Sequence, residues 1–187
     1  MVEKSPRAHR PYQLVEYNPA WKEEFRKIAD FLRKVFGEEI IDIQHVGSTA
    51  IPGTIAKPQI DISVVVKDLA KIKPYYKAME EAEFTPRGNY TGKGEEYFTR
   101  DSKDGSRTVS VHIYPQGHPK IEAMLMLRDY LLMHREDCEL YSAIKKKLYL
   151  KFANDYPAYC KAKKEAMEPI KERARTWQAS RITERGV

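Results

Sequence analysis

The sequence predicts an α+β fold, with a mixed β-sheet that has helices on one face and a C-terminal helical layer. Two observations lead to this prediction. Four segments have the pattern of strands, at 40–46, 59–66, 95–101 and 107–114, and side chains alternate in character most clearly in 59–66 and 107–114. Helical patterns then run almost without a break through 121–134, 137–152 and 155–177. The order of helix, strands, helix, hairpin and helices is typical of α+β domains rather than of repeated βαβ units.

The first helix is predicted to begin at Asn18-Pro19 and to end at Gly37. Asparagine is a good N-cap, proline suits the first helical turn, and glycine favours the C-terminal end. Between these limits the apolar residues recur at three- and four-residue spacing and share one face of the helix: Trp21, Phe25, Ile28, Leu32 and Val35.

The strand at 59–66 has two different faces. One face carries Ile60, Ile62, Val64 and Val66, and the other carries Asp61, Ser63 and Val65. In the preceding strand, His45 falls on the face of Ile41 and Ile43, which favours a core histidine. A helix capped by Asp68 should follow and reach about Ala82, with a break at Pro74.

The next two strands form a hairpin around Asp104-Gly105. Its second arm places Val109, Val111 and Ile113 on one face and Thr108, Ser110, His112 and Tyr114 on the other. His118 is expected in the following loop. In the last helical segment, Pro157 suits a first turn, and Pro169 should kink or divide the helix.

We expect a single domain over 14–177, with the sheet core in 14–115 and the helical layer in 119–177. Residues 1–13 are expected to form a flexible arm, and 178–187 a frayed tail. Hydrophobic residues make up 42% of the chain and charged residues 32%, as in soluble proteins. No segment has the length of a membrane span or the pattern of a secretory signal, and Cys138 and Cys160 do not form a metal or disulfide motif. These features favour the cytoplasm.

The net charge is +6, and much of the excess lies in the C-terminal helices. Basic helices attract polyanions, so nucleic acid is one alternative partner. Acidic residues are interspersed in the same region, as at Glu165, Glu168 and Glu172. A solvated helix face is therefore the favoured interpretation, because the sequence carries no recognisable nucleic-acid motif.

The segment 46–62 holds the main candidate site. The Gly47-Ser48 turn would present backbone N–H groups to a phosphate, and Ser48 or Thr49 would add a hydroxyl. Asp61, on the next strand, could hold a cation beside that anion. Lys57 could pair with phosphate as a point charge. Each of these features is common alone, and an ordinary glycine turn with a solvated loop is the competing interpretation.

The combination of a Gly-Ser turn and an Asp on the following strand resembles the nucleotidyltransferase superfamily. A more specific resemblance is to the GrpB family, over roughly residues 14–167. It rests on five stretches that lie in register: Glu16-Tyr17-Asn18-Pro19-Ala20-Trp21, residues 45–53 with 57–62, Val111-His112-Ile113, Leu127-Arg128-Asp129-Tyr130-Leu131, and Tyr141 to Tyr159. This resemblance implies a nucleotidyltransferase-like (polymerase-beta-like) fold. Members of the family also occur fused to dephospho-coenzyme A kinase.

The resemblance also implies a metal site, from which this chain departs. Active members of the superfamily place two acids two residues apart on one strand and a third acid on a neighbouring strand. Aligned in this way, the chain offers Asp61, Ser63 and His112 as ligands. Such a set is poor for Mg²⁺ and better for Mn²⁺ or Zn²⁺. Glu95 or Glu96 could replace a missing acid.

Three functional hypotheses follow. The leading one is a protein that binds ATP or a similar nucleoside triphosphate with a divalent metal (Mg²⁺, Mn²⁺ or Zn²⁺) and transfers a nucleotidyl group to a small acceptor. In it Asp61 and His112 are catalytic, and Arg107, with Arg100 as a further candidate, reaches the triphosphate unless it forms a salt bridge. The alternatives are a non-catalytic module that binds a nucleotide or coenzyme, and a nucleic-acid-associated protein that uses the basic helices.

Overall fold

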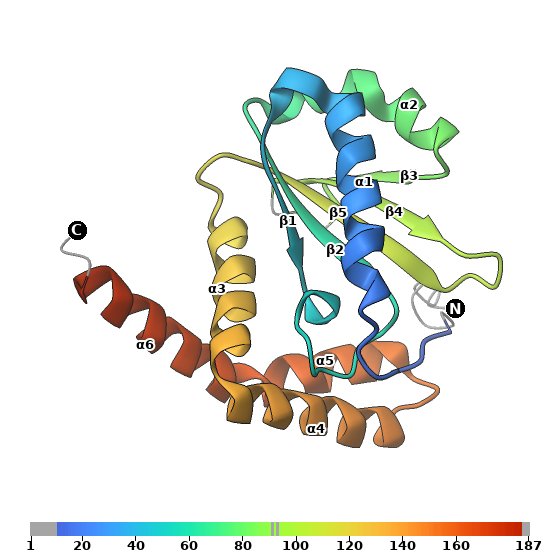
Figure 1. The fold of residues 1–187 in the computed structure, drawn as a ribbon. Coiled ribbons are helices and arrows are strands. Elements are labelled where there is room, and N and C mark those ends of the chain that lie inside the picture. Colours follow the sequence, from blue (N-terminus) through green and yellow to red (C-terminus); the bar gives the residue numbers. More distant parts are fainter. Residues whose placement is uncertain (1–10, 91, 93, 185–187) are drawn as a thin grey trace.

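In the computed structural model, which describes residues 11–90, 92 and 94–184, a single mixed sheet forms the centre of the protein. Its strand order is β1-β2-β5-β4-β3 (Figure 1). The strands are β1 (Ile40–Val46), β2 (Ile60–Val66), β3 (Thr85–Gly88), β4 (Glu96–Asp101) and β5 (Arg107–Pro115). Strands β2 and β5 are parallel, and the other neighbours are antiparallel. The predicted α+β fold and its four strands are confirmed.

Strand β3 was not predicted from the sequence. It has four residues, Thr-Pro-Arg-Gly, and pairs with β4 at the edge of the sheet. Proline cannot donate a ladder hydrogen bond, and an edge strand tolerates this loss. The segment shows neither alternation nor β-branched runs, so its pairing depends on the tertiary contact with β4 rather than on its own pattern.

One face of the sheet is covered by α1 (Ala20–Phe36), by the 3₁₀ helix η3 (Leu69–Tyr75) and by α2 (Tyr76–Glu81) (Figure 1). Asp68 caps η3 by accepting from the N–H of Ala70 at 2.9 Å. Pro74 lies inside η3, and the regular α-helix begins only at Tyr76. The predicted break at Pro74 is therefore present as a change from a 3₁₀ helix to an α-helix.

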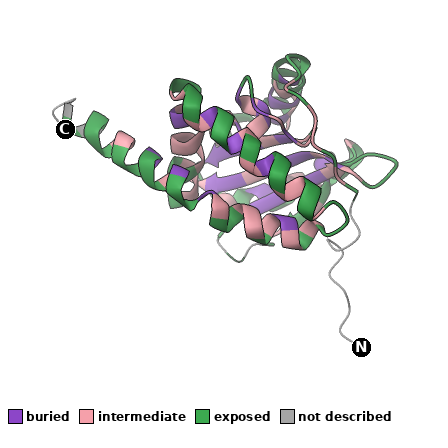
Figure 2. Ribbon diagram, turned by 90° about the horizontal axis from the view of Figure 1, so that it is seen from below, coloured by how far each residue is buried: buried purple, intermediate pink, exposed green. Residues whose placement is uncertain are grey.

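The core lies between these helices and the alternate residues of β2 and β5. Ile62, Val64, Val66, Val111 and Ile113 are all 0% exposed. Figure 2 shows the same sheet as a buried layer beneath more exposed helices. The alternation of side chains between the two faces of each strand thus decides which of them enter the core, as predicted.

An irregularity in β1 changes one detail of this prediction. The register shifts between Ile40 and Asp42, whose partners are Val66 and Val65. Ile43 joins the core cluster, whereas Ile41 is 43% exposed and lies beside Val65 on the opposite side. The expected common face of His45 and Ile41 is therefore wrong, because a bulge reverses the alternation locally.

The C-terminal helices are α3 (Pro119–Met133), α4 (Arg135–Lys151), α5 (Tyr156–Ala166) and α6 (Glu168–Glu184). Helices α4 and α5 pack at one end of the sheet, and α3 lies beside β1 (Figure 1). A second apolar cluster joins these helices to Ile51 in the loop after β1. Pro169 stands in the first turn of α6, where proline is well tolerated, and so it marks a helix start rather than a kink.

Both ends of the described chain are more ordered than expected. The expected frayed tail began after Trp177, yet α6 continues to Glu184. At the other end, the Tyr12 hydroxyl donates to the carbonyl of Phe152 at 2.6 Å, and its ring packs against Tyr149, Tyr156 and Tyr159. These contacts hold the end of the predicted flexible arm; its residues 1–10, like 185–187, lie outside the described residues.

Candidate functional site

The face of the sheet opposite α1 is polar around β2 and β5. These strands are in parallel register, with Asp61 opposite Ser110 and Ser63 opposite His112. Asp61, His112 and Gly47 line one cavity of about 500 Å³, which α3 and α6 enclose from the other side. The structure thus brings together three of the residues that the sequence indicated, and their roles remain predictions.

Gly47 ends β1 next to Asp61, since Val46 is the register partner of Asp61. Its φ is +74°, a value that residues other than glycine rarely adopt. A Cβ at this position would lie 2.6 Å from Oδ2 of Asp61. Only glycine allows the turn and the carboxylate to approach this closely, so this juxtaposition is the most specific feature of the site.

Thr49 and His45 serve the fold of the turn. Thr49 is 2% exposed, and its hydroxyl donates to the carbonyl of Gln59 at 3.0 Å. His45 Nε2 lies 3.0 Å from the same hydroxyl and must donate to it, because the hydroxyl proton is already used. Burial, with help from Arg128, lowers the pKa of His45 to about 4. His45 is thus a neutral structural histidine. Thr49 was expected to contact a phosphate, but its hydroxyl is bonded to Gln59 and His45 instead.

Ser48 opens the short 3₁₀ helix after Gly47 and is half-buried. The carbonyl of Ser48 accepts from the Thr54 hydroxyl at 2.8 Å. Three residues further on, Ile51 lines the cavity and is only 2% exposed. The backbone of the turn is therefore fixed by internal contacts while Gly47 itself remains exposed.

Helix α4 contacts the loop that follows this turn. Ile55 donates its N–H to the Ser142 hydroxyl at 3.2 Å, and its carbonyl accepts from Nζ of Lys145. Lys145 is 1% exposed and lies 3.9 Å from the ring of Tyr141. Burial, followed by the neighbouring charge of Lys163, lowers the pKa of Lys145 to about 7.

Ser63 does not reach the cavity. It is 0% exposed, and within the described residues its Oγ has no hydrogen-bond partner. The predicted alignment of Ser63 as the second metal ligand therefore has no geometric support. Parity places Ser63 on the correct face, but the packing between β2 and its neighbours covers it.

Gln59, just before β2, is the residue that contacts Asp61. Its Nε2 donates to Asp61 Oδ1 and to Ser110 Oγ, the latter at 3.1 Å. Ser110 continues the network to the hydroxyl of Tyr97 at 2.9 Å, which in turn accepts from Nη1 of Arg107 at 2.9 Å. Asp61 is thus one end of a chain of polar contacts that runs across the sheet.

His112 is held in one orientation by Glu95. Its Nδ1 lies 3.0 Å from Glu95 Oε2, which also accepts from the Tyr114 hydroxyl at 2.9 Å. The Glu95 side chain is fully buried, whereas that of His112 is 22% exposed. The His112 ring also stacks on Tyr97, with centroids 4.5 Å apart. With Nδ1 turned to Glu95, Nε2 is the nitrogen left for a ligand.

Two tyrosines that donate to buried glutamates, Tyr114 on this face and Tyr76 on the face of α1, are hard to ionise. Burial first, and then the hydrogen bond to Glu95, raise the pKa of Tyr114 far above its usual value. Tyr76 has a raised pKa for the same kinds of reason, burial and its bond to Glu96. Glu96 therefore has a structural partner, and Glu95 acts on the site through His112 rather than as a replacement ligand.

Lys57 and Arg107 lie apart from the cavity of Asp61. They line a smaller pocket of about 240 Å³ together with Tyr12 and Tyr156. The side chain of Arg107 is 5% exposed and pairs with Asp101. Lys57 contacts Gln59 Oε1 at 3.3 Å and lies over the Tyr156 ring. The predicted phosphate contact of Arg107 is unsupported, because Asp101 and Tyr97 already bind its guanidinium.

Helices α3 and α6 supply basic side chains to the cavity of Asp61. The basic residues that line it are Lys120, Arg128, Lys171 and Arg175, beside the acidic Glu168. Arg128 reaches β1, where Nη1 donates to Gln44 Oε1 at 2.9 Å and to the His45 carbonyl at 3.0 Å. Apolar residues of α3, among them Leu127 and Leu131, complete the wall. The cavity therefore suits a ligand that is anionic and partly apolar.

The oxygen donors at the site fit a resident divalent ion poorly. Asp61 and His112 face the cavity from the sheet and Glu168 from α6. The Asp61 carboxylate is already bonded to an amide, and that of Glu168 pairs with Lys171 and Arg175. Among the residues that the structure describes, histidine, cysteine and acidic side chains form no group of three that could hold a metal. Mg²⁺ prefers near-octahedral oxygen ligands, so this set does not select it.

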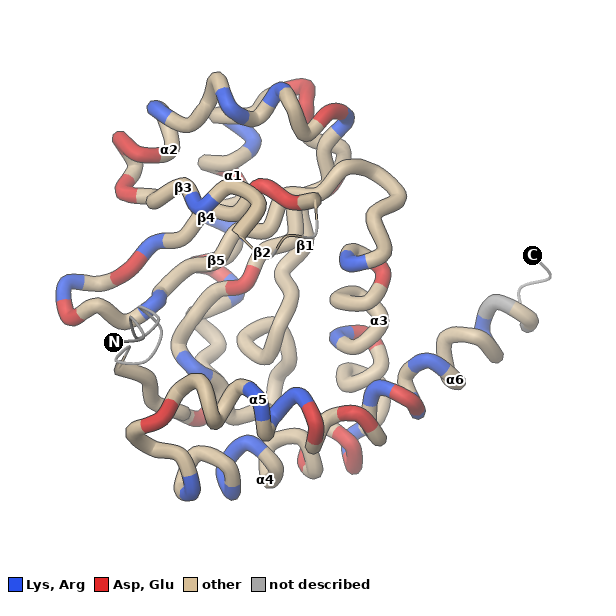
Figure 3. The backbone as a smooth tube through the Cα atoms, turned by 180° about the vertical axis from the view of Figure 1, so that it is seen from behind, with Lys and Arg blue, Asp and Glu red and all other residues tan. Residues whose placement is uncertain are grey.

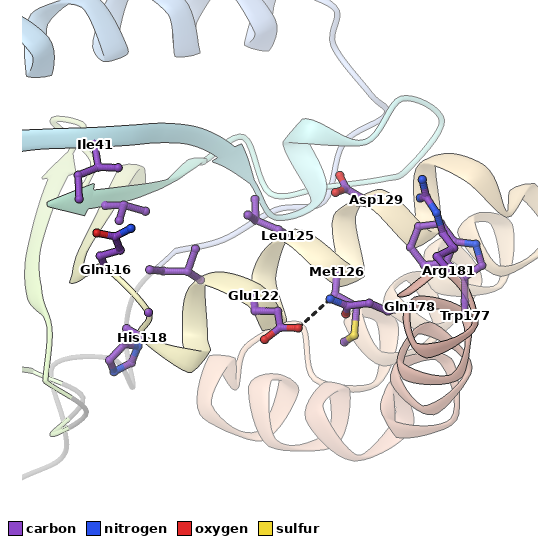
Figure 4. A pocket seen from close by; sticks show the side chains of 13 residues that line it. Ile41, Gln116, His118, Glu122, Leu125, Met126, Asp129, Trp177, Gln178 and Arg181 are labelled. Atoms are coloured by element: carbon purple, nitrogen blue, oxygen red, sulfur yellow. Dashed lines mark hydrogen bonds between the residues drawn. The ribbon is translucent and has the colours of Figure 1, made fainter. Parts of the chain in front are cut away.

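A larger groove of about 670 Å³ runs between α3, α6 and the edge of β1 (Figure 4). Ile41 and Trp177 lie at its ends, and Glu122 accepts from Gln178 across it at 2.8 Å. The predicted site residues line other pockets. We therefore take the smaller cavity, where Gly47, Asp61 and His112 converge, as the candidate site.

Sequence reasoning missed the positions of Gln59 and Arg128 at this site. Gln59 lies two residues before Asp61, so strand parity alone could have placed it beside the carboxylate. Arg128 pairs with its neighbour Asp129 at 2.7 Å and also reaches β1. Its reach to β1 depends on the packing of α3 against the sheet, which no local pattern reports.

Comparison with known proteins agrees with this fold. The GrpB protein family matches residues 11–173. The UPF0157 protein YqkA of Bacillus subtilis (strain 168) is 34% identical over 177 residues, which are 95% of this chain and 51% of that protein. The chain thus spans about half the length of this relative.

Solved structures give the same result. A crystal structure of the conserved protein GrpB from Enterococcus faecalis has a TM-score of 0.75 and 28% identity, covering 84% of this chain and 99% of that one. Cid1 poly(U) polymerase has a TM-score of 0.50 and 13% identity, over 74% of this chain and 45% of its own, and so shows similarity of fold alone. Within the described residues, every helix is too short or too polar to cross a membrane. The chain belongs to the GrpB family and has a nucleotidyltransferase-like fold.

Proposed function

We propose that this protein binds a nucleoside triphosphate, such as ATP, in the cavity formed by Gly47, Asp61 and His112. The observation that carries the proposal is the close approach of the Gly47 backbone to Asp61, which leaves no room for a Cβ. A turn of this kind presents backbone N–H groups to phosphate oxygens. The cavity volume of about 500 Å³ is within the usual range for small-molecule sites.

The charges around the cavity support an anionic ligand. Lys120, Arg128, Lys171 and Arg175 line it from two helices. Lys171 and Arg175 both pair with Glu168, at 3.1 and 2.8 Å, so they would exchange this partner for phosphate. A divalent ion that arrives with the nucleotide would meet Asp61 and His112, and the imidazole favours Mn²⁺ or Zn²⁺ over Mg²⁺.

His112 gives the site a candidate general base. Glu95 holds Nδ1, so Nε2, when it is not bound to a metal ion, would accept the proton of a small acceptor hydroxyl or amine. The acceptor atom would then bond to the α-phosphorus while pyrophosphate leaves. This nucleotidyl transfer is the catalytic form of the proposal, and it rests on the same cavity.

A non-catalytic nucleotide- or coenzyme-binding module is the second candidate. The observation that favours it is that no second acid lies two residues from Asp61 on this strand: Gln59 and Ser63 stand at those positions, and the Gln59 amide donates to the Asp61 carboxylate. Binding without turnover needs the turn and the cavity but no second carboxylate. Product analysis after incubation with labelled ATP distinguishes the two candidates.

The nucleic-acid alternative loses support from the charge pairing of the last helices. Acidic residues are interspersed with basic ones along α6 (Figure 3). Arg175 bonds to Glu168 and Glu172, and Arg173 bonds to Asp137. These pairs reduce the positive field that would attract a polyanion.

Calorimetric titration with ATP, with and without Mn²⁺, tests the proposed function. Wild type should bind, and Gly47→Ala should lose at least about tenfold in affinity, because the methyl group would strike Asp61 and shift the turn. Asp61→Asn should abolish the part of the affinity that depends on metal. Equal ATP affinity in wild type and both variants would reject the proposal.

Gly53→Ala is the matched control. Gly53 also has a positive φ, +83°, but a Cβ there would meet nothing within 4 Å. The two variants therefore carry a similar backbone strain and differ in the contact with Asp61. The Gly53 variant should keep wild-type ATP affinity within about twofold.

A further inference from the structure

We propose that the Gln59 carboxamide occupies the place of a bridging cation between β2 and β5, so that the native chain itself supplies the hydrogen-bond donor to the Asp61 carboxylate. The proposal concerns the same cavity as the proposed function. It does not depend on nucleotide binding, because it can be tested with a metal ion alone.

The orientation of the amide follows from its neighbours. Lysine can only donate, so the atom 3.3 Å from Nζ of Lys57 must be the carbonyl oxygen, Oε1. The amide nitrogen then points toward Asp61 and Ser110, and its two N–H groups are matched by two acceptors. The backbone of Gln59 is fixed as well, since its carbonyl accepts from Thr49 and its N–H bonds to Lys57 at 2.7 Å.

The two acceptors lie on different strands. Asp61 and Ser110 are register partners of the parallel pair β2 and β5. A cation that joined these strands would approach the same carboxylate and hydroxyl oxygens. The amide supplies positive N–H dipoles at this point, and no metal is needed to offset the carboxylate.

A divalent ion must therefore displace Gln59 before it can use Asp61. An amide nitrogen is not a ligand for hard cations, and the displaced side chain would lose its bonds to Asp61, Ser110 and Lys57. Gln59 is thus a specificity-determining residue that disfavours metal at this site. Replacing its N–H donor by a carboxylate oxygen should reverse the preference.

The decisive variant is Gln59→Glu, which is nearly isosteric and places two carboxylates two residues apart on one face. The Gln59→Glu variant should bind Mn²⁺ at least about tenfold more tightly than wild type. Electron paramagnetic resonance measures this affinity from the signal of free Mn²⁺, without nucleotide. Adding Asp61→Asn to this variant should remove the gain. Wild-type binding as tight as that of the Glu variant, or no gain in the Glu variant, would overturn the proposal.

Two controls keep the result interpretable. Gln116→Glu makes the same change in the groove beside α3 and should leave Mn²⁺ affinity within about twofold of wild type. Should Gln59→Glu lose the circular dichroism spectrum of the folded protein, Gln59→Asp provides a shorter carboxylate for the same titration. Failure of ATP binding would leave these metal measurements unaffected, so the two proposals can fail separately.

Discussion

The two faces of the central sheet use the same strands for different purposes. Toward α1, β2 and β5 present Ile62, Val64, Val111 and Ile113, which are all 0% exposed. Toward α3 and α6 they present Asp61, Ser110 and His112, each joined to a polar neighbour. One face thus stabilises the fold through burial, and the other holds polar groups in fixed positions. The difference indicates that stability and chemistry can be changed separately at adjacent residues.

The largest expected effect is on the apolar face. Ile62→Ala should lower the free energy of unfolding by about 3 kcal/mol, because it leaves a cavity in a packed core. The neighbouring change Asp61→Asn should cost less than about 1 kcal/mol. Urea denaturation of both variants measures the contrast. Equal losses would break the comparison between the faces.

The apolar face also contains His45, which should make it sensitive to acid. The pKa of His45 is lowered to about 4 in the folded protein, from 6.5 in the unfolded chain. Between these values the unfolded chain binds more protons, so the free energy of unfolding falls as the pH drops from 6.5 toward 4. We expect His45 to contribute about 2 kcal/mol to this loss.

Urea denaturation at pH 7.5 and pH 4.5 tests this contribution against His45→Gln. Glutamine can still donate to Thr49 and does not titrate, so the variant should lose less stability on acidification than wild type. Parallel pH profiles for the two proteins would show that His45 is not responsible.

A moderate effect is expected from Glu95 on the polar face. Glu95→Ala leaves His112 and Tyr114 without their acceptor and should cost about 2 kcal/mol. Glu95→Gln keeps an acceptor oxygen and should cost about half as much. Thermal unfolding followed by circular dichroism gives both values. A harmless Glu95→Ala would mean that this network does not need to be complete.

The smallest effect is expected from a polar pair outside both faces. Arg135 and Glu139 bond at 2.8 Å on α4, with side chains 91% and 64% exposed. Arg135→Ala should change the free energy of unfolding by less than about 0.5 kcal/mol. The same denaturation series checks this value and calibrates what a polar bond contributes when water surrounds it.

Much of the fold could be predicted because local patterns agree with it. Alternation in 59–66 and 107–114 identified the buried face and placed Asp61 and His112 together. The site was less predictable, since its details depend on packing. Burial removed Ser63 from the cavity, and internal bonds engaged Thr49 and Arg107. Arg128 reaches its partners across the chain, a contact that sequence spacing cannot report.

The contacts of Ile55 with Ser142 and Lys145 have a consequence for how the molecule opens. They join the loop after Gly47 to α4, and Ile51 joins it to the second apolar cluster. The loop should therefore share the opening equilibrium of the helical layer, and its amide hydrogens should exchange with solvent at the rate of that unit. The glycine turn then belongs to a cooperative segment rather than to an independently fluctuating loop.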